Sequence, residues 1–147
     1  MLEDGEGLVF ESAAHCLHVA DLHPEAGLLA PPGTHERALA YQWAFFAMAE
    51  LEPPVMAFRA SEESDPERAQ VAAGRFRAAA QAVEDALDGR DYLVAGRFGV
   101  ADVVSSAVLF FAKRFGLTDG LPRIEAYLAR LDERPARRRA LEIGSAS

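Results

Sequence analysis

His15, His18 and His23 lie close together near the amino terminus, and histidine is a common metal ligand. His15 and His18 are three residues apart, so a helix would place them on one face. A protein metal site, however, needs three or four ligands in a defined geometry. Because only two of these side chains are well placed, we interpret them as surface histidines and expect no metal.

Cys16 is the single cysteine of the chain. A thiol near the amino terminus of a helix can become nucleophilic, because its pKa is lowered there. Cys16 falls in the second turn of a predicted helix, where a lone cysteine more often behaves as a small buried hydrophobic residue. A reactive thiol stays open as the alternative, whereas an internal disulfide framework and a cysteine-rich zinc module are excluded.

The composition limits the classes of partner that the chain can have. Its 147 residues fit one domain of ordinary size. The formal net charge is −8, so the chain should repel the phosphate backbone of nucleic acids. No run of about 18 apolar residues is present, and residues 1–6 are acidic where a signal peptide would be basic. We therefore expect a cytoplasmic protein that binds neither nucleic acid nor membrane.

Alanine, leucine, glutamate and arginine dominate the sequence, and all four are strong helix formers. One short strand is predicted over 8–10, and Ser12 is expected to cap the first helix. Proline and glycine residues mark 23–33 as a linker, and Pro53 with Pro54 should end or kink the second helix. The predicted helices cover 12–22, 34–51 with a continuation over 55–59, 66–87, 100–111, 122–133 and 135–141, and the tail 144–147 is expected to fray.

The helix that starts at residue 100 carries a capping pattern. Gly99 takes the cap position, and Asp102 can accept a hydrogen bond from the backbone N–H of that cap. Phe98 and Val103 stand where a hydrophobic staple requires apolar residues. The helix is apolar on nearly all sides, which is typical of a helix in the middle of a core. The chain is therefore predicted to be an all-α domain built around this helix.

These segments together resemble the glutathione S-transferase family. One matching feature is a short strand followed by Glu-Ser at a helix start, and the most specific one is the loop with its capping box and staple. The resemblance covers almost the whole chain and is carried, in the family's order, by residues 8–14, 41–43, 50–54 and 92–102. It implies a helical bundle like the carboxy-terminal domain of that family, with a short β/α remnant at the amino terminus.

The resemblance also implies a division of the chain. Residues 1–22 correspond to the last strand and third helix of the family's thioredoxin-like domain, 23–33 to a linker, and 34–147 to the all-helical domain. The chain is then expected to be truncated, because the family's catalytic Tyr, Ser or Cys lies in the earlier part of the thioredoxin-like domain. No residue of this chain is assigned a catalytic function.

In the family, the Glu-Ser pair holds the γ-glutamyl end of glutathione, which implies that Glu11 and Ser12 do so here. Ser12 joins a hydroxyl to the free N–H groups of a helix start, a natural carboxylate site, and Glu11 can accept a hydrogen bond from an ammonium group. A plain N-cap is the structural alternative for Ser12.

The family's helical domain also lines the pocket for the hydrophobic co-substrate. The candidates for this pocket are Trp43, Phe46, Glu50 and Pro53. Packing in the core or at a subunit interface is the alternative for the aromatic residues.

Two departures from the family pattern stand out. His15 and His18 replace apolar residues, which suggests a face that is not fully buried, and Gly99 replaces the usual Ser or Thr cap.

The resemblance implies an enzyme that conjugates glutathione to hydrophobic electrophiles, or reduces disulfides with it, when it is complete. Glutathione would then be a substrate, and no metal is implied. The alternative is a non-catalytic interaction module derived from the helical domain. The family's dimers use the first two helices of that domain, so we expect a homodimer through residues 34–88, with Trp43 and Phe76 among its large apolar groups.

Overall fold

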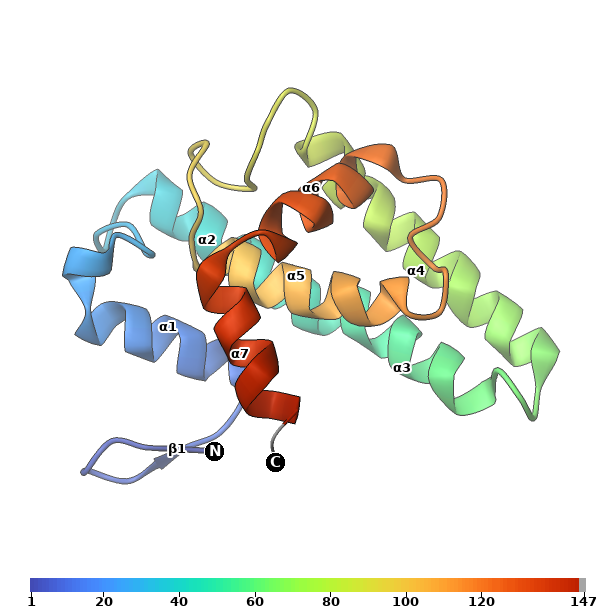
Figure 1. Ribbon diagram of the computed structural model, residues 1–147, viewed down its shortest axis with the longest axis horizontal. Coiled ribbons are helices and arrows are strands. Elements are labelled where there is room, and N and C mark those ends of the chain that lie inside the picture. Colours follow the sequence, from blue (N-terminus) through green and yellow to red (C-terminus); the bar gives the residue numbers. More distant parts are fainter. Residues whose placement is uncertain (146–147) are drawn as a thin grey trace.

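The computed structural model describes residues 1–145, and helices make up most of this part of the chain (Figure 1). The predicted all-α fold class is confirmed, because a two-stranded hairpin is the only sheet within residues 1–145. The tail was predicted to fray from 144, but α7 continues through Ser145, and 146 and 147 lie outside the described residues. The elements are β1 (Leu2–Glu3), β2 (Leu8–Val9), α1 (Ser12–Leu22), the 3₁₀ turn η1 (Pro24–Ala26), α2 (His35–Phe46), the π-helical turn η2 (Ala47–Leu51), α3 (Glu52–Ser61), α4 (Pro66–Ala86), α5 (Val100–Lys113), α6 (Pro122–Asp132) and α7 (Pro135–Ser145).

The amino-terminal hairpin is only half predicted by the sequence. Its strands, Leu2–Glu3 and Leu8–Val9, pair antiparallel. The Asp4 carboxylate closes the turn, because it accepts hydrogen bonds from the backbone N–H groups of Glu6 at 3.0 Å and Gly7 at 3.1 Å. The sequence predicts β2 but not β1, since two residues carry no readable periodicity.

Two helices begin with a side-chain cap. The Thr34 hydroxyl accepts a hydrogen bond from the backbone N–H of Arg37 at 3.2 Å, at the start of α2. The Asp65 carboxylate accepts one from the backbone N–H of Arg68 at 3.1 Å, at the start of α4. Each side chain satisfies one of the N–H groups that a helix start leaves free.

The path from α2 through η2 to α3 bends around Pro53 and Pro54. Proline has no N–H, so the α-helical hydrogen bonds to the carbonyls of Ala49 and Glu50 cannot form. The chain takes the wider π-helical turn η2 just before the two prolines and then continues as α3. The prediction that the helix is interrupted here and then resumes is confirmed.

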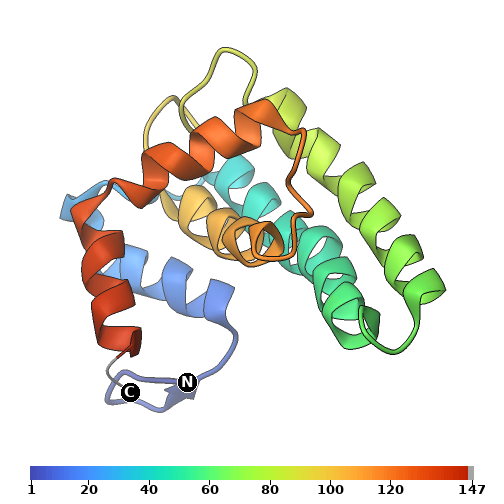
Figure 2. The same cartoon turned by 45° about the vertical axis from the view of Figure 1, so that its right-hand side comes forward.

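α5 runs through the middle of the fold, as predicted (Figures 1 and 2). It contacts α1, α2, η2, α3 and α6, so most of the core forms around it. Its buried side chains are Val100, Ala101, Asp102, Val104, Ser105, Ser106, Val108, Leu109 and Ala112.

Asp102 caps α5 and is fully buried. Its carboxylate accepts hydrogen bonds from the backbone N–H of Gly99 at 2.9 Å and of Leu93 at 3.0 Å. It also accepts one from the Tyr127 hydroxyl, at 2.9 Å. The predicted bond from Asp102 to its cap is present, and the same carboxylate ties the preceding loop and α6 to the start of α5.

Gly99 is explained by a close approach of the backbone. A Cβ atom at this position would lie 2.8 Å from the carbonyl oxygen of Leu28. The same oxygen accepts a hydrogen bond from the backbone N–H of Val100 at 2.9 Å. A serine or threonine cap would therefore collide with the segment that joins α1 to α2.

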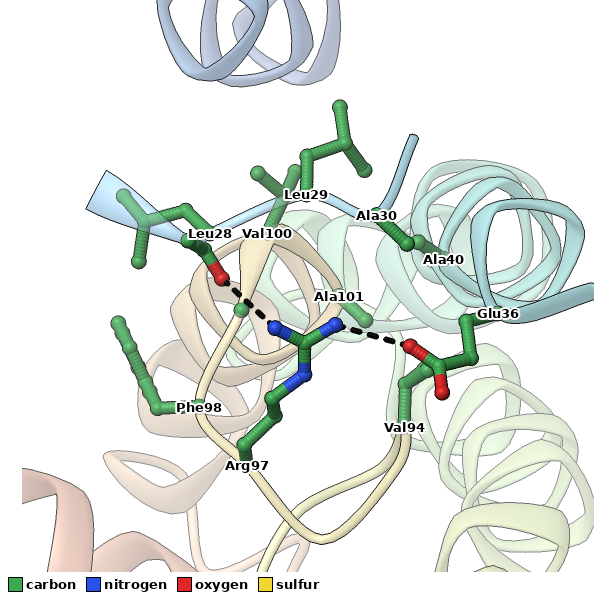
Figure 3. Close-up of a pocket in the computed structure, with 12 residues that line it drawn as sticks. Leu28, Leu29, Ala30, Glu36, Ala40, Val94, Arg97, Phe98, Val100 and Ala101 are labelled. Carbon is green, nitrogen blue, oxygen red and sulfur yellow. Dashed lines mark hydrogen bonds and ion pairs between the residues drawn. The ribbon is translucent and has the colours of Figure 1, made fainter. Parts of the chain in front are cut away.

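Hydrogen bonds from arginine side chains fix the position of the segment 23–33 between α1 and α2. Figure 3 shows Arg97 reaching between this segment and α2. Its guanidinium donates to the carbonyl of Gly27 at 3.4 Å and pairs with Glu36 at 2.8 Å. On the other side, Arg37 donates to the carbonyl of Ala30 at 3.0 Å. The cavity left beside these groups has a volume of about 20 Å³, which is room for a water molecule and not for a ligand.

Candidate functional site

Ser12 is the first residue of α1, and Glu11 occupies the N-cap position with φ 73° and ψ 119°. The expectation that Ser12 is the N-cap is therefore wrong. No side chain caps α1, so the N–H groups of its first turn keep their free hydrogen-bonding capacity. A positive φ is uncommon for glutamate, and such strain is often found where a protein binds a ligand. Both side chains are exposed.

Ser12 lines a hollow that we name the α1–α5 pocket. Its volume is about 200 Å³. The first turns of α1, the junction of η2 with α3, and one side of α5 form its walls. The lining residues are Ser12, Cys16, Met48, Glu52, Val103, Val104, Ala107, Val108 and Phe111.

The walls of the α1–α5 pocket are largely apolar. Glu52 is the only charged residue among those lining it. Burial raises the pKa of the Cys16 thiol, so less of it is ionised at neutral pH and it is a weaker nucleophile. Cys16 packs against the hydrophobic core. These observations favour the interpretation of Cys16 as a small hydrophobic residue over a reactive thiol.

A second hollow, which we name the α3–α4 groove, lies between the η2–α3 path and α4 and has a volume of about 830 Å³. It contains three of the four residues proposed for the co-substrate pocket: Phe46, Glu50 and Pro53. Trp43 does not line it, because this side chain is only 8% exposed and belongs to the core. The remaining lining residues are Ala49, Pro54, Ala57, Arg68, Val71, Ala72, Arg75, Ala78, Ala79 and Ala82.

The structure thus places the two sets of candidate site residues in different hollows. Ser12 lines the α1–α5 pocket, whereas Phe46, Glu50 and Pro53 line the α3–α4 groove. Met48 and Glu52, four residues apart, line the pocket, whereas Ala49 and Glu50 between them line the groove.

Comparison with known proteins identifies the fold and the family. The family described as "Glutathione S-transferase, C-terminal domain" matches residues 43–135. The chain belongs to the glutathione S-transferase family. It is 32% identical over 140 residues to the glutathione S-transferase GstA of Escherichia coli O157:H7, which covers 92% of this chain and 67% of that protein.

Solved structures of glutathione S-transferases have the same fold. A glutathione transferase of Methylococcus capsulatus strain Bath superposes with a TM-score of 0.89 at 31% identity, over 99% of this chain and 72% of that one. A sphingomonad glutathione S-transferase, solved in complex with glutathione, gives a TM-score of 0.89 at 26% identity, over 99% of this chain and 73% of that one.

Three histidines of this glutathione S-transferase chain, His15, His18 and His23, lie against other polar groups of the chain. His15 Nε2 lies 2.7 Å from the carbonyl oxygen of Val9, and His18 Nε2 lies 3.1 Å from a carboxylate oxygen of Asp4. Polar residues at these α1 positions therefore attach the hairpin to α1. His23 takes no part in this attachment, and its Nδ1 lies 3.2 Å from a carboxylate oxygen of Glu25. Within residues 1–145 there is no group of three or more histidine, cysteine or acidic side chains that could hold a metal ion.

The other predicted residues lie around the start of α5. Gly99 and Asp102 form the capping contact already described. The Phe98 ring packs edge-on against Tyr92, at 6.0 Å between ring centroids, and beneath the guanidinium of Arg134. Val103 lines the α1–α5 pocket, so its pairing with Phe98 as a staple stays a prediction.

The contribution of α5 to the pocket was not predicted from the sequence. Met48 and Glu52 carry a usable signal, because a spacing of four puts them on one helix face. The valines of α5 resemble ordinary core residues in the sequence.

No helix within residues 1–145 is both long and apolar enough to span a membrane.

Proposed function

We propose that this chain forms the γ-glutamyl-binding and co-substrate half of a glutathione transferase site. In the reaction the glutathione thiolate attacks an electrophilic carbon of a small hydrophobic compound, a C–S bond forms, and a leaving group departs or a double bond is saturated. The observation that carries the proposal is that Ser12, at an uncapped helix start, lines an apolar pocket. A thioredoxin-like half would supply the group that activates the thiol.

Glutathione carries a carboxylate and an ammonium group at its γ-glutamyl end. The free N–H groups of the first α1 turn and the Ser12 hydroxyl can donate to the carboxylate, and the helix dipole favours its negative charge. The Glu11 carboxylate can accept from the ammonium group. Neither side chain has to break a hydrogen bond with residues 1–145 to do so.

We further propose that the α1–α5 pocket, rather than the α3–α4 groove, holds the co-substrate. The pocket adjoins Ser12, and its valine and phenylalanine walls suit an apolar compound. Such walls favour conjugation of hydrophobic electrophiles over reduction of polar disulfides.

The α3–α4 groove is proposed as the surface through which two copies associate. Its lining includes the exposed apolar side chain of Val71, at 60% exposure. Glu50 lines one wall, and Arg68 with Arg75 lines the other. In a two-fold dimer the same patch meets itself, so walls of opposite charge can pair between copies.

A non-catalytic interaction module is the alternative function. It is supported by the exposed apolar side chains on the hairpin and α1, where Phe10 is 74% and Leu22 is 57% exposed. Such a face can bind another domain or another protein.

For either function we propose a cytoplasmic location, which suits a chain with one unpaired cysteine.

The two functions are separated by steady-state kinetics on the native protein isolated from its source cells, together with its intact mass. A mass above 15.9 kDa and turnover of glutathione with a chlorodinitrobenzene electrophile support the transferase. In that protein Ser12→Ala should lower kcat/KM for glutathione about tenfold, and Ser64→Ala, an exposed serine in the α3–α4 loop, should leave it unchanged. A native protein of 15.9 kDa without turnover supports the interaction module.

A further inference from the structure

Glu52 places one negative charge in the apolar α1–α5 pocket. It is half-buried, and no cation or hydrogen-bond donor of residues 1–145 pairs with its carboxylate. Arg59, on the same helix, instead stacks on the ring of Phe111 with its guanidinium carbon 5.7 Å from the ring centroid. Arg59 does not line the pocket.

The position of Glu52 follows from the helical path. Met48 and Glu52 lie four residues apart across the junction of η2 and α3, and both line the pocket. Ala49 and Pro53, each one residue further along, line the α3–α4 groove on the other side. Glu52 therefore lines the same pocket as the valines of α5 and does not line the groove on the opposite side.

A carboxylate at an apolar wall attracts cations more strongly than one surrounded by water, because the local dielectric screens it less. The same charge repels an anionic ligand. Ser12 and the Cys16 thiol are the other polar groups in the lining, and both are neutral. The charge preference of the pocket is therefore set by Glu52.

The volume of the pocket limits the size of its ligand. A protein cavity of about 150 Å³ holds a benzene molecule. The α1–α5 pocket, at about 200 Å³, therefore has room for one aromatic ring with a short substituent.

We propose that the α1–α5 pocket binds small aromatic compounds that carry an ammonium group, and that the Glu52 carboxylate pairs with that group. As a statement about the co-substrate, this rests on the proposed transferase function. As a statement about ligand binding, it holds without glutathione and can be tested without it.

The single cysteine provides a direct readout, because Cys16 lines the pocket. The purified chain is treated with iodoacetamide, and the alkylation rate of Cys16 is followed by intact mass. Three probes of similar shape are compared as protecting ligands: phenethylammonium, neutral 2-phenylethanol and anionic 3-phenylpropionate. We expect phenethylammonium to protect at a concentration about threefold to tenfold lower than the alcohol, and the anion to protect least.

The variant Glu52→Gln should remove this preference, so that the ammonium and alcohol probes protect equally. Glu63→Gln, which removes the same charge from the exposed loop before α4, is the matched control and should keep the preference. A preference that survives in Glu52→Gln would overturn the assignment to Glu52.

A second readout does not depend on the thiol. Titration with phenethylammonium should shift the NMR signals of the Val103, Val104 and Val108 methyl groups. If phenethylammonium neither shifts these methyl groups nor protects Cys16, the ligand site is refuted. Glutathione is absent from both experiments, so this failure would leave glutathione binding at Ser12 untouched. Conversely, loss of glutathione binding with intact ammonium binding would refute only the transferase assignment.

Discussion

The Tyr127 hydroxyl donates a hydrogen bond of 2.9 Å to the Asp102 carboxylate, and both side chains are buried. This contact joins α6 to the N-terminal cap of α5. Burial raises the pKa of Asp102 and raises that of Tyr127 well above its ordinary value, since each ionised form loses water. The centre of the fold therefore depends on a small polar cluster inside an apolar core.

Removing the Asp102 carboxylate should destabilise the fold strongly. Asp102→Ala leaves the N–H groups of Leu93 and Gly99 and the hydroxyl of Tyr127 without their acceptor. We expect the free energy of unfolding to fall by roughly 2–4 kcal/mol, as measured by urea denaturation. Tyr127→Phe removes only one donor and should cost about 1 kcal/mol. A loss below about 0.5 kcal/mol for Asp102→Ala would show that the cluster does not stabilise the fold.

The close approach of the backbone at Gly99 predicts that adding a methyl group there destabilises the fold. Gly99→Ala would put a Cβ atom 2.8 Å from the Leu28 carbonyl oxygen, so the segment between α1 and α2 must shift. We expect a loss of about 1–3 kcal/mol in thermal or urea unfolding. Gly74→Ala, in α4, meets nothing within 4 Å and should instead stabilise the chain by about 0.5–1 kcal/mol. Equal effects of the two substitutions would contradict the packing argument.

The turn of the hairpin should depend on acid pH. Hydrogen bonds from the backbone N–H groups of Glu6 and Gly7, with a smaller contribution from His18, lower the pKa of Asp4. A lowered pKa means that the stabilisation is present above the ordinary pKa, near 4, and is lost as the pH falls through the lowered value. We expect the amide hydrogens of residues 2–9 to exchange faster in that acid range, relative to the intrinsic rate. In Asp4→Asn this pH-dependent step should be absent, and a step that persists would assign the effect to another group.

Self-association through the α3–α4 groove is tested by charge reversal. Glu50→Arg alone would put positive charges at both positions, and Arg75→Glu alone would put negative charges at both. Like charges would then face each other between the two copies, so each single variant should weaken the dimer. The double variant restores opposite charges and should recover association. Sedimentation velocity measures the dimer fraction in all four proteins. A monomeric wild-type chain at every concentration would exclude this interface.

Local patterns in the sequence predict most of the helices correctly. Thr34 and Asp65 are recognisable caps, and Pro53 with Pro54 marks the interruption between α2 and α3. These features act within a few residues of the chain. The wrong assignment of Ser12 as a cap arises because the bend at Glu11 depends on a positive φ, which residue type alone does not reveal for glutamate.

Long-range contacts are the part that the sequence does not reveal. The buried carboxylate of Glu84, in α4, accepts hydrogen bonds from the backbone N–H groups of Arg123 and Ile124 and so caps α6. No local pattern connects residues about forty positions apart. The separation of Ser12 from Phe46 is of the same kind, because it depends on which sides of the η2–α3 path face α1 and α4.

The central claim is that Ser12 and the first turn of α1 bind glutathione, and an NMR titration of the purified chain with glutathione tests it most directly. The account predicts shifts of the backbone amide signals of Ser12 and Ala13, with a Kd about tenfold higher in Ser12→Ala and unchanged in Ser64→Ala. Binding of equal strength in Ser12→Ala, or shifts confined to the α3–α4 groove, would contradict the claim.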